Sequence, residues 1–264
     1  MTCIAHLSDL HFGRELPSII AGLLKSLDAI QPELIIISGD LTQRATHREF
    51  RDARAFLDSL KQPYMIIPGN HDLSAYRLWE RFIYPWRKWR HYISDDLQPV
   101  VQRKGFTATG VNTARRIGFY LDLSRGRISQ HQVKRVCKVF KDTPEDSLNI
   151  VVAHHPFWLP QSSLSRSLIG NRDHAIKSFS EAGVDLILGG HIHLAYVEPV
   201  KGIIVSHAGT STSHRLIAHQ PNSFNVIKGD RKQLVMEQME WTGHEFECVN
   251  PERFKRTPHG WQLQ

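Results

Sequence analysis

The chain has 264 residues, of which 41% are apolar and 22% are charged, and its formal net charge is +7. These values are typical of a globular protein with one large domain, and no apolar stretch approaches the ~18 residues that a membrane span needs. The basic balance favours anionic partners such as nucleotides, nucleic acid or an anionic membrane surface.

Apolar runs alternate with helical patterns along the first two thirds of the chain. A possible capping box at Thr46, with Glu49 three residues on, marks the start of the second helix. In chain order we predict a strand at 3–8, a helix at 17–30, a strand at 34–38, a helix at 46–60, and strands at 64–67 and 106–111. A helix at 129–140, a strand at 148–153, a helix at 171–182 and a strand at 185–188 follow.

After residue 195 the alternation of strands and helices gives way to successive strands, which are predicted at 197–200, 203–206, 223–227 and 233–239. Continuous apolar strands separated by helices indicate sheets covered on both faces. We therefore expect an α/β fold, a four-layer α/β/β/α sandwich with two central mixed β-sheets. The domain is expected to span residues 1–240, and residues 241–264, rich in charge, Pro and Gly, to form a loosely packed C-terminal tail.

Residues 77–93 combine three of the six tryptophans with four arginines and one lysine. Two interpretations stay open for this segment. Its aromatic face packs on the core while the arginines face solvent, or it forms a basic, aromatic rim for a nucleotide base or a lipid headgroup. Pro85 breaks the helix there, which is consistent with a lid-like helical insertion over residues 77–95.

Five predicted strands end in Asp, His or Asn side chains. Open α/β sheets place their ligand sites at the carboxyl ends of strands. Glycine beside several of these residues lets the backbone turn tightly. The residues are Asp9, His11, Asp40, Asn70, His154, His191 and His193.

Carboxylates, imidazoles and an amide oxygen are ligands that suit Mn, Fe or Zn. One metal ion cannot use seven side chains, but two ions that share one carboxylate can. Taken singly, each motif has a structural explanation: Asp9-x-His11 as a polar strand end or helix cap, the sequence from Asn70 as a turn, and His191-x-His193 as a surface pair. Their joint occurrence at strand ends favours a metal centre.

Together these motifs resemble the calcineurin-like metallophosphoesterase superfamily, and within it the bacterial class III cyclic-nucleotide phosphodiesterase-like proteins. The closer similarity lies in His6-Leu7-Ser8-Asp9-Leu10-His11 and in Ser38-Gly39-Asp40-Leu41-Thr42. The motifs extend from residue 9 to residue 193, and no motif of the family is identified after about residue 215.

The resemblance implies two metal ions, Mn or Fe before Zn, with Asp40 bridging them. One ion would be held by Asp9, His11, Asp40 and His193, and the other by Asp40, Asn70, His154 and His191. His71 would lie at the substrate phosphate as an acid or charge stabiliser. Asp72 either orients His71 or acts as a helix N-cap.

The implied reaction is hydrolysis of a phosphate ester. Two metal ions lower the pKa of a bridging water, and the resulting hydroxide attacks phosphorus in line. The metals and His71 neutralise the charge that builds on the phosphoryl oxygens, and a protonated His71 can donate to the leaving alkoxide.

Three further residues are candidates for substrate contact. His155 directly follows a predicted ligand, and two interpretations stay open for it: structural packing, or contact with the ligands or the substrate. His207 follows another strand end, in a loop that the resemblance places beside the metals. Arg14 can reach a phosphate as a charge-assisted donor, although a solvated arginine explains it equally well.

We expect a phosphodiesterase that acts on a small nucleotide-type diester. The alternatives are a DNA nuclease of the repair-complex type, a lipid-diphosphate hydrolase at a membrane surface, and a non-catalytic scaffold. The three widely separated cysteines, Cys3, Cys137 and Cys248, indicate reduced thiols and a cytoplasmic location, and residues 1–8 leave no room for a signal peptide. The physiological substrate and the oligomeric state do not follow from the sequence.

Overall fold

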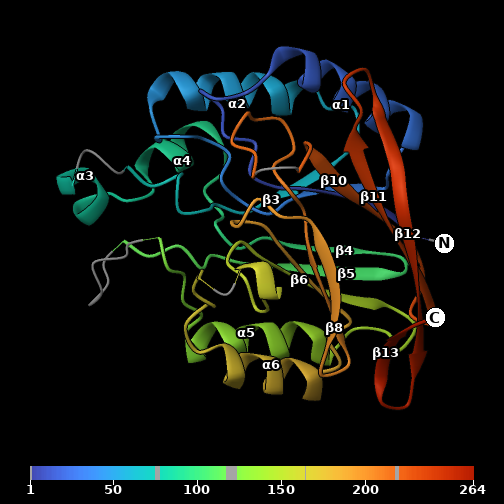
Figure 1. Cartoon of the computed structure of the whole chain (residues 1–264). Coiled ribbons are helices and arrows are strands. Elements are labelled where there is room, and N and C mark those ends of the chain that lie inside the picture. Colours follow the sequence, from blue (N-terminus) through green and yellow to red (C-terminus); the bar gives the residue numbers. More distant parts are fainter. Residues whose placement is uncertain (1, 75–77, 117–123, 164, 218–219) are drawn as a thin grey trace.

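The computed structural model describes residues 2–74, 78–116, 124–163, 165–217 and 220–264. Two β-sheets lie face to face, and helices cover the outer face of each sheet (Figure 1). The four-layer sandwich predicted from the sequence is therefore confirmed.

The first sheet has seven strands in the order β13-β12-β11-β10-β1-β2-β3. The three strands β1, β2 and β3 run parallel, so their carboxyl ends meet at one edge, while the other strands pair antiparallel. The strands are β1 (Thr2–Leu7), β2 (Leu34–Ile37), β3 (Tyr64–Ile66), β10 (Ser223–Gly229), β11 (Gln233–Trp241), β12 (Phe246–Thr257) and β13 (Gly260–Leu263).

The second sheet has six strands in the order β4-β5-β6-β7-β9-β8. Its four central strands are parallel, and β4 and β8 pair antiparallel at its two edges. The strands are β4 (Val100–Arg103), β5 (Phe106–Val111), β6 (Leu148–Ala153), β7 (Leu186–Gly189), β8 (Tyr196–Val200) and β9 (Ile203–His207).

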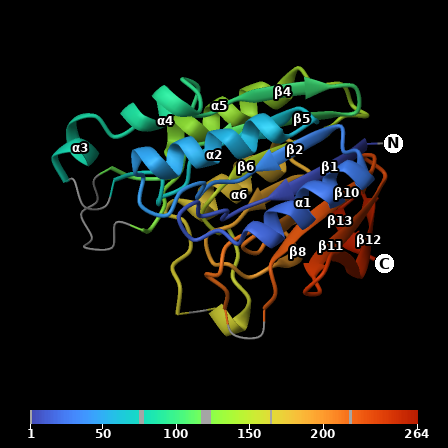
Figure 2. The same ribbon diagram turned by 90° about the horizontal axis from the view of Figure 1, so that it is seen from above.

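Helices α1 (Pro17–Ile30), α2 (His47–Ser59) and α4 (Arg87–Tyr92) lie on the seven-stranded sheet, and α5 (Gln130–Lys141) and α6 (Arg172–Glu181) lie on the six-stranded sheet (Figures 1 and 2). The predicted capping box is present at α2, where Thr46 and Glu49 satisfy each other's backbone N–H groups. A single turn of 3-10 helix occupies Gln161–Ser163. No helix in the described ranges is long and apolar enough to cross a membrane.

The continuous apolar strands arise because both of their faces are covered. In β2, Leu34 and Ile36 pack between the two sheets, while Ile35 and Ile37 pack against the helices. All four side chains are buried. This arrangement explains why these strands show no polar alternation.

The segment proposed as a lid-like insertion forms two short helices separated at Pro85, namely α3 (Leu78–Ile83) and α4. Its first residue, Arg77, lies outside the described residues. Trp89 of α4 is fully buried and packs edge-to-face against Phe50 of α2. Trp79 of α3 is instead 56% exposed. Packing on the core therefore describes α4, while the rim that would recruit a base or a headgroup stays a prediction for the exposed helix α3.

The expectation of a loosely packed tail is wrong for residues 246–263, which form β12 and β13 at the edge of the seven-stranded sheet. Phe254 and Trp261 are buried there between the sheets. Most of the remaining β12 side chains are exposed or half-buried, because one face of this edge is solvated. The charged composition that suggested a tail belongs to that solvated face.

Candidate metal centre

The seven candidate ligands follow the carboxyl ends of five parallel strands, three in one sheet and two in the other. Because the sheets face each other, these ends lie together on one side of the sandwich. Ligand atoms of six of the residues form two compact groups, each with its atoms within 4.8 Å of one another. The groups are Asp9, His11 and His193, and Asp40, His154 and His191.

The backbone at these positions is held in an unusual conformation. Five of the residues have positive φ angles, a region that non-glycine residues rarely adopt. Hydrogen bonds between the strand-end loops hold this conformation: Asp9 N donates to the Gly39 carbonyl (3.1 Å) and His11 N to the Asp40 carbonyl (3.0 Å). Such strain is typical of functional sites. The five are Asp9 (53°), His11 (48°), Asp40 (51°), His191 (74°) and His193 (58°).

The first group brings one carboxylate and two imidazoles to a common point. Asp9 Oδ1 lies 3.2 Å from His193 Nε2 and 3.6 Å from His11 Nε2, and the two Nε2 atoms are 3.1 Å apart. Ligands that each lie about 2.0–2.1 Å from one ion at tetrahedral angles are separated by about 3.3 Å. Asp9 Oδ1 is buried and accepts no hydrogen bond from the described residues. The group therefore fits a cation.

The second group repeats this arrangement. Asp40 Oδ2 lies 3.2 Å from His154 Nε2, and His191 stacks edge-on against His154 with ring centroids 5.2 Å apart. Among the described residues, the buried atoms Asn70 Oδ1 and His154 Nε2 have no hydrogen-bond partner. Unpaired buried polar atoms are costly, so both atoms are better explained as ligands of an ion.

Asp40 connects the two groups. Its Oδ2 atom lies 3.2 Å from His154 Nε2 in one group and 3.9 Å from His11 Nε2 in the other. Its Oδ1 atom accepts a hydrogen bond from His71 N at 2.8 Å. A single carboxylate is thus positioned to serve both groups.

Backbone carbonyls fix the histidine tautomers. Nδ1 of His154 donates to the Ser38 carbonyl at 2.8 Å, and Nδ1 of His193 donates to the Arg215 carbonyl at 2.7 Å. Nδ1 of His11 donates to the Thr42 carbonyl at the longer distance of 3.4 Å. With Nδ1 protonated, Nε2 presents its lone pair to the cluster, as metal-ligating histidines do.

The charges of the cluster support one another. Burial opposes ionisation of the two carboxyls, but His193 beside Asp9 and His154 beside Asp40 hold both pKa values well below their usual range. Burial also opposes the charge on His154, yet Asp40 raises the pKa of this imidazole to about 9, so the carboxylate strongly favours a cation at His154 Nε2, whether a proton or a metal ion. Burial and the His154 charge lower the pKa of His191 to about 3. The carboxylates are therefore anionic at neutral pH.

His71 lies at the edge of the cluster and is held by a partner that differs from the predicted one. Its Nδ1 atom donates to the Gln43 carbonyl at 2.8 Å. The Asp72 carboxylate instead accepts hydrogen bonds from the backbone of Leu41, Thr42 and Gly69 and from the Thr42 hydroxyl. Its oxygens thus join the loop after β2 to the turn after β3, while roles for Asp72 in orienting His71 or in capping the following helix stay predictions.

Arg215 is the residue that the sequence reasoning missed. Its Nη1 atom lies 3.1 Å from His71 Nε2 and 3.3 Å from His11 Nε2, so the guanidinium points into the cluster. It lies in the loop that follows β9, the strand that ends at His207. The last candidate predicted in this region was His207, and Arg215 lies eight residues further along the chain.

The three weaker candidates for substrate contact lie in different surroundings. Both ring nitrogens of His155 are engaged, Nδ1 with the Thr113 hydroxyl (2.7 Å) and Nε2 with the Ser124 carbonyl (2.8 Å). His207 is fully buried and stacks on Tyr196, with ring centroids 4.6 Å apart. Arg14 is exposed and reaches His214 at 3.5 Å. His155 packs against the His191 ring, and His207 donates to the Gly190 carbonyl beside it. Of the three candidates, only Arg14 is open to solvent.

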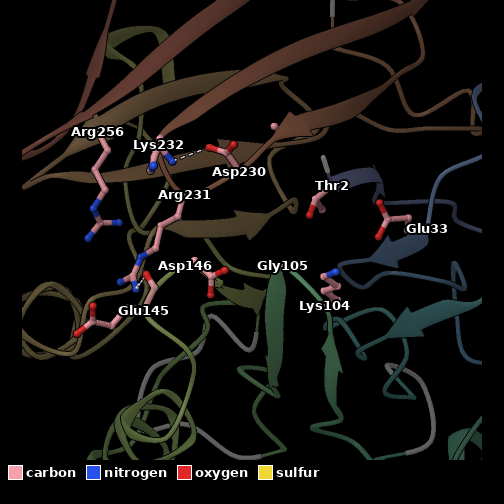
Figure 3. A pocket seen from close by; sticks show the side chains of 11 residues that line it. Thr2, Glu33, Lys104, Gly105, Glu145, Asp146, Asp230, Arg231, Lys232 and Arg256 are labelled. Atoms are coloured by element: carbon pink, nitrogen blue, oxygen red, sulfur yellow. Dashed lines mark hydrogen bonds between the residues drawn. The ribbon is translucent and has the colours of Figure 1, made fainter.

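A cavity of about 1110 Å³ lies at the opposite end of the strands, beside the start of β1 (Figure 3). Charged side chains of both signs line it in equal number, which favours no single class of ligand. They are Lys104, Arg231, Lys232 and Arg256, with Glu33, Glu145, Asp146 and Asp230. The convergent ligand atoms, and not this cavity, mark the functional end of the molecule.

Comparison with known proteins connects this geometry to a family. The family model described as calcineurin-like phosphoesterase matches residues 3–195. That range contains all seven candidate ligands together with His71 and Asp72.

Curated relatives share low sequence identity with the chain. A glycerophosphodiester phosphodiesterase of Enterobacter lignolyticus is 32% identical over 83 residues, which cover 27% of this chain and 30% of that protein. A 3′,5′-cyclic adenosine monophosphate phosphodiesterase of Escherichia coli K12 is 25% identical over 189 residues, or 63% of this chain and 58% of that protein. The matched segments thus span less than two thirds of the length of these relatives.

Solved structures share the fold. A purple acid phosphatase from yellow lupin superimposes with a TM-score of 0.68 at 11% identity, covering 95% of this chain and 53% of that one. A dimetal phosphatase from Danio rerio gives a TM-score of 0.64 at 12% identity, covering 97% of this chain and 99% of that one. Both agree with the two-sheet sandwich described above.

Proposed function

The chain belongs to the calcineurin-like phosphoesterase family, and from this premise we propose that it hydrolyses phosphate esters with the help of two metal ions. The observation that carries the proposal is the pair of ligand groups joined by Asp40, in which the buried atoms Asp9 Oδ1, Asn70 Oδ1 and His154 Nε2 find no hydrogen-bond partner among the described residues.

The donor set fits two ions that share a carboxylate. Asp9, His11, Asp40 and His193 would hold one ion, and Asp40, Asn70, His154 and His191 the other. Oxygen and imidazole donors in equal number at each ion, without a thiolate, suit Mn, Fe or Zn, and we propose Mn or Fe. When bound, such ions supply Lewis acidity and water that is activated at neutral pH.

The protein's own residues bind and orient the phosphoryl group. Arg215 is positioned to donate a charge-assisted hydrogen bond to a phosphoryl oxygen above the cluster. His71, whose Nδ1 atom is held by the Gln43 carbonyl, presents Nε2 to the same space. From there it can neutralise charge on the phosphoryl group or donate a proton to the leaving oxygen.

For the substrate we propose a small nucleotide-type phosphodiester. The relatives named above include a cyclic-nucleotide phosphodiesterase and a glycerophosphodiester phosphodiesterase, and diesters are common to both. The net charge of +7 favours such an anionic substrate. The three cysteines are free, which is consistent with our proposal of a cytoplasmic location.

The test compares hydrolysis of bis(p-nitrophenyl) phosphate with that of p-nitrophenyl phosphate in the presence of Mn²⁺. Wild type should hydrolyse the diester, Asn70→Ala and His71→Ala should lose most of this activity, and His174→Ala, an exposed position on α6, should retain it. Absence of activity on both substrates would refute the proposal.

The same variants separate the alternative functions. Degradation of linear DNA that is abolished by Asn70→Ala would favour the nuclease. Turnover of a lipid diphosphate in vesicles, without turnover of small diesters, would favour the lipid-diphosphate hydrolase. Retention of bound metal without any hydrolysis would favour the scaffold.

A further inference from the structure

The tip of α3 exposes an unusual group of large apolar side chains. Trp79 is 56% exposed, Phe82 40%, Ile83 62% and Tyr84 58%. Among the described residues, these four account for more than half of the large apolar side chains that are classed as exposed. We call them the α3 patch. An apolar group of this size on a surface marks an interaction site or an aggregation hazard.

The base of α3 is held firmly, so the patch is not a frayed end. Glu80 and Lys88 form an ion pair at 2.8 Å, and each side chain is only 9% exposed. The guanidinium of Arg81, which is 4% exposed, donates to the carbonyls of Arg115 (2.8 Å) and Arg116 (3.3 Å). The polar side of the helix therefore faces the protein, and its apolar side faces outward.

The patch lies at the same end of the molecule as the metal centre. Glu80, Tyr84 and Lys88 line a small recess together with Asp72, whose carboxylate holds the loop after β2. Figures 1 and 2 show α3 projecting beyond the sheets at the end opposite the amino terminus. Because β1 begins at that terminus and delivers Asp9 at its other end, α3 and the ligand groups share one side of the sandwich.

Cationic side chains adjoin the patch, since Arg87 and Arg90 lie on α4, which follows it in the chain, and the Arg116 carbonyl accepts a hydrogen bond from Arg81 of α3. Arg87, Arg90 and Arg116 are exposed, and within the described ranges no ion pair joins them to an acidic side chain. Glu80 is the one acidic residue in the sequence 78–93, and Lys88 neutralises it. The rim is therefore positive, in keeping with the net charge of +7.

We propose that the α3 patch docks the protein on an anionic lipid bilayer, with the apolar tip inserted at the headgroup level. Trp and Tyr favour the membrane interface, and arginines beside them are attracted to anionic headgroups. A short projecting tip with three consecutive exposed residues, Phe82, Ile83 and Tyr84, suits a deformable bilayer better than a complementary protein surface. The metal centre then faces the membrane surface.

This proposal does not depend on the reaction that the metal centre catalyses. It predicts binding to vesicles by the full chain whether or not the metals are present. Hydrolysis of a small water-soluble diester serves only as a check that the variants are folded.

The experiment measures co-sedimentation of the full chain with vesicles of phosphatidylcholine alone and with vesicles that contain one quarter phosphatidylglycerol. Wild type should bind the anionic vesicles and bind the neutral ones at least about tenfold less strongly. The double variant Trp79→Ser/Ile83→Ser should bind anionic vesicles at least about tenfold less strongly than wild type. Arg87→Gln/Arg90→Gln should lose the preference for anionic lipid.

The matched control is Leu263→Ser in β13, which lies on the side of the molecule opposite α3 in Figure 1; it removes an exposed apolar side chain and should bind like wild type. Absence of vesicle binding by the wild type, or equal loss of binding in the control, would overturn the proposal. So would a wild-type dimer in solution that Trp79→Ser/Ile83→Ser converts to a monomer without a change in vesicle binding, because a second copy would then be the partner.

Discussion

Replacing Arg215 with alanine tests whether this side chain stabilises the phosphoryl group during the reaction. Its Nη1 atom lies 3.1 Å from His71 Nε2 and 3.3 Å from His11 Nε2, so the guanidinium occupies the space above the ligand groups. A donor of this kind contributes about 3–4 kcal/mol to transition-state stabilisation. Since about 1.4 kcal/mol corresponds to tenfold in rate, we expect kcat/KM for a diester to fall about 100-fold to 1,000-fold.

The assay is steady-state hydrolysis of bis(p-nitrophenyl) phosphate with Mn²⁺, together with the metal content of each variant. The backbone carbonyl of Arg215, which accepts from His193 Nδ1, is kept in Arg215→Ala, so the metal content should not change. Arg48→Ala removes an exposed arginine on α2 and should change kcat/KM less than about threefold.

Two results would refute this reasoning. A loss of less than about threefold in Arg215→Ala would mean that the guanidinium does not contact the reacting group. A loss of metal in parallel with activity would mean that Arg215 supports the ligands and not the substrate.

Three further predictions concern the packing and the loops around the site. Trp261→Ala should lower the free energy of unfolding by about 3–5 kcal/mol in urea titrations, because this indole is buried between the sheets and donates to Asp185 at 3.0 Å; a cost below about 1 kcal/mol would restore the tail interpretation. Gly190→Ala should abolish most diester hydrolysis, because the added Cβ would collide with the Asp9 carboxylate, whereas Gly170→Ala has only ordinary or slightly tight contacts and should retain activity. Asp72→Ala should lower both the melting temperature and the metal content, because four donors in two loops lose their acceptor; unchanged values would show that other contacts hold these loops.

The sequence predicted the layers and the ligand groups because both depend on local patterns. An apolar run such as Leu34–Ile37 requires cover on both faces, and polar residues directly after such runs must lie at the carboxyl edge of a sheet. Asp9, Asp40 and His154 are consequently placed without knowledge of the loops. The ligand positions could be expected from strand ends, whereas their division into two groups was implied by the family resemblance.

The parts that the sequence did not predict depend on contacts between distant segments. Arg215 approaches His71 across 144 positions of the chain, and no local pattern distinguishes it from other arginines. Asp72 is adjacent to His71 in sequence, but its carboxylate turns toward the backbone of Thr42. The half-solvated strand β12 has the composition of a loop, because a single buried residue, Phe254, marks its inner face over its second half.

The most direct test of the central claim is the metal stoichiometry of the purified chain, measured by mass spectrometry after saturation with Mn²⁺ and removal of free ions. Wild type should hold two ions per chain. Asn70→Ala, which removes a ligand from one group only, should hold about one ion and lose diester hydrolysis, and His174→Ala should match wild type. One ion or none in the wild type, or two ions and full activity in Asn70→Ala, would contradict the claim that two metal ions share Asp40.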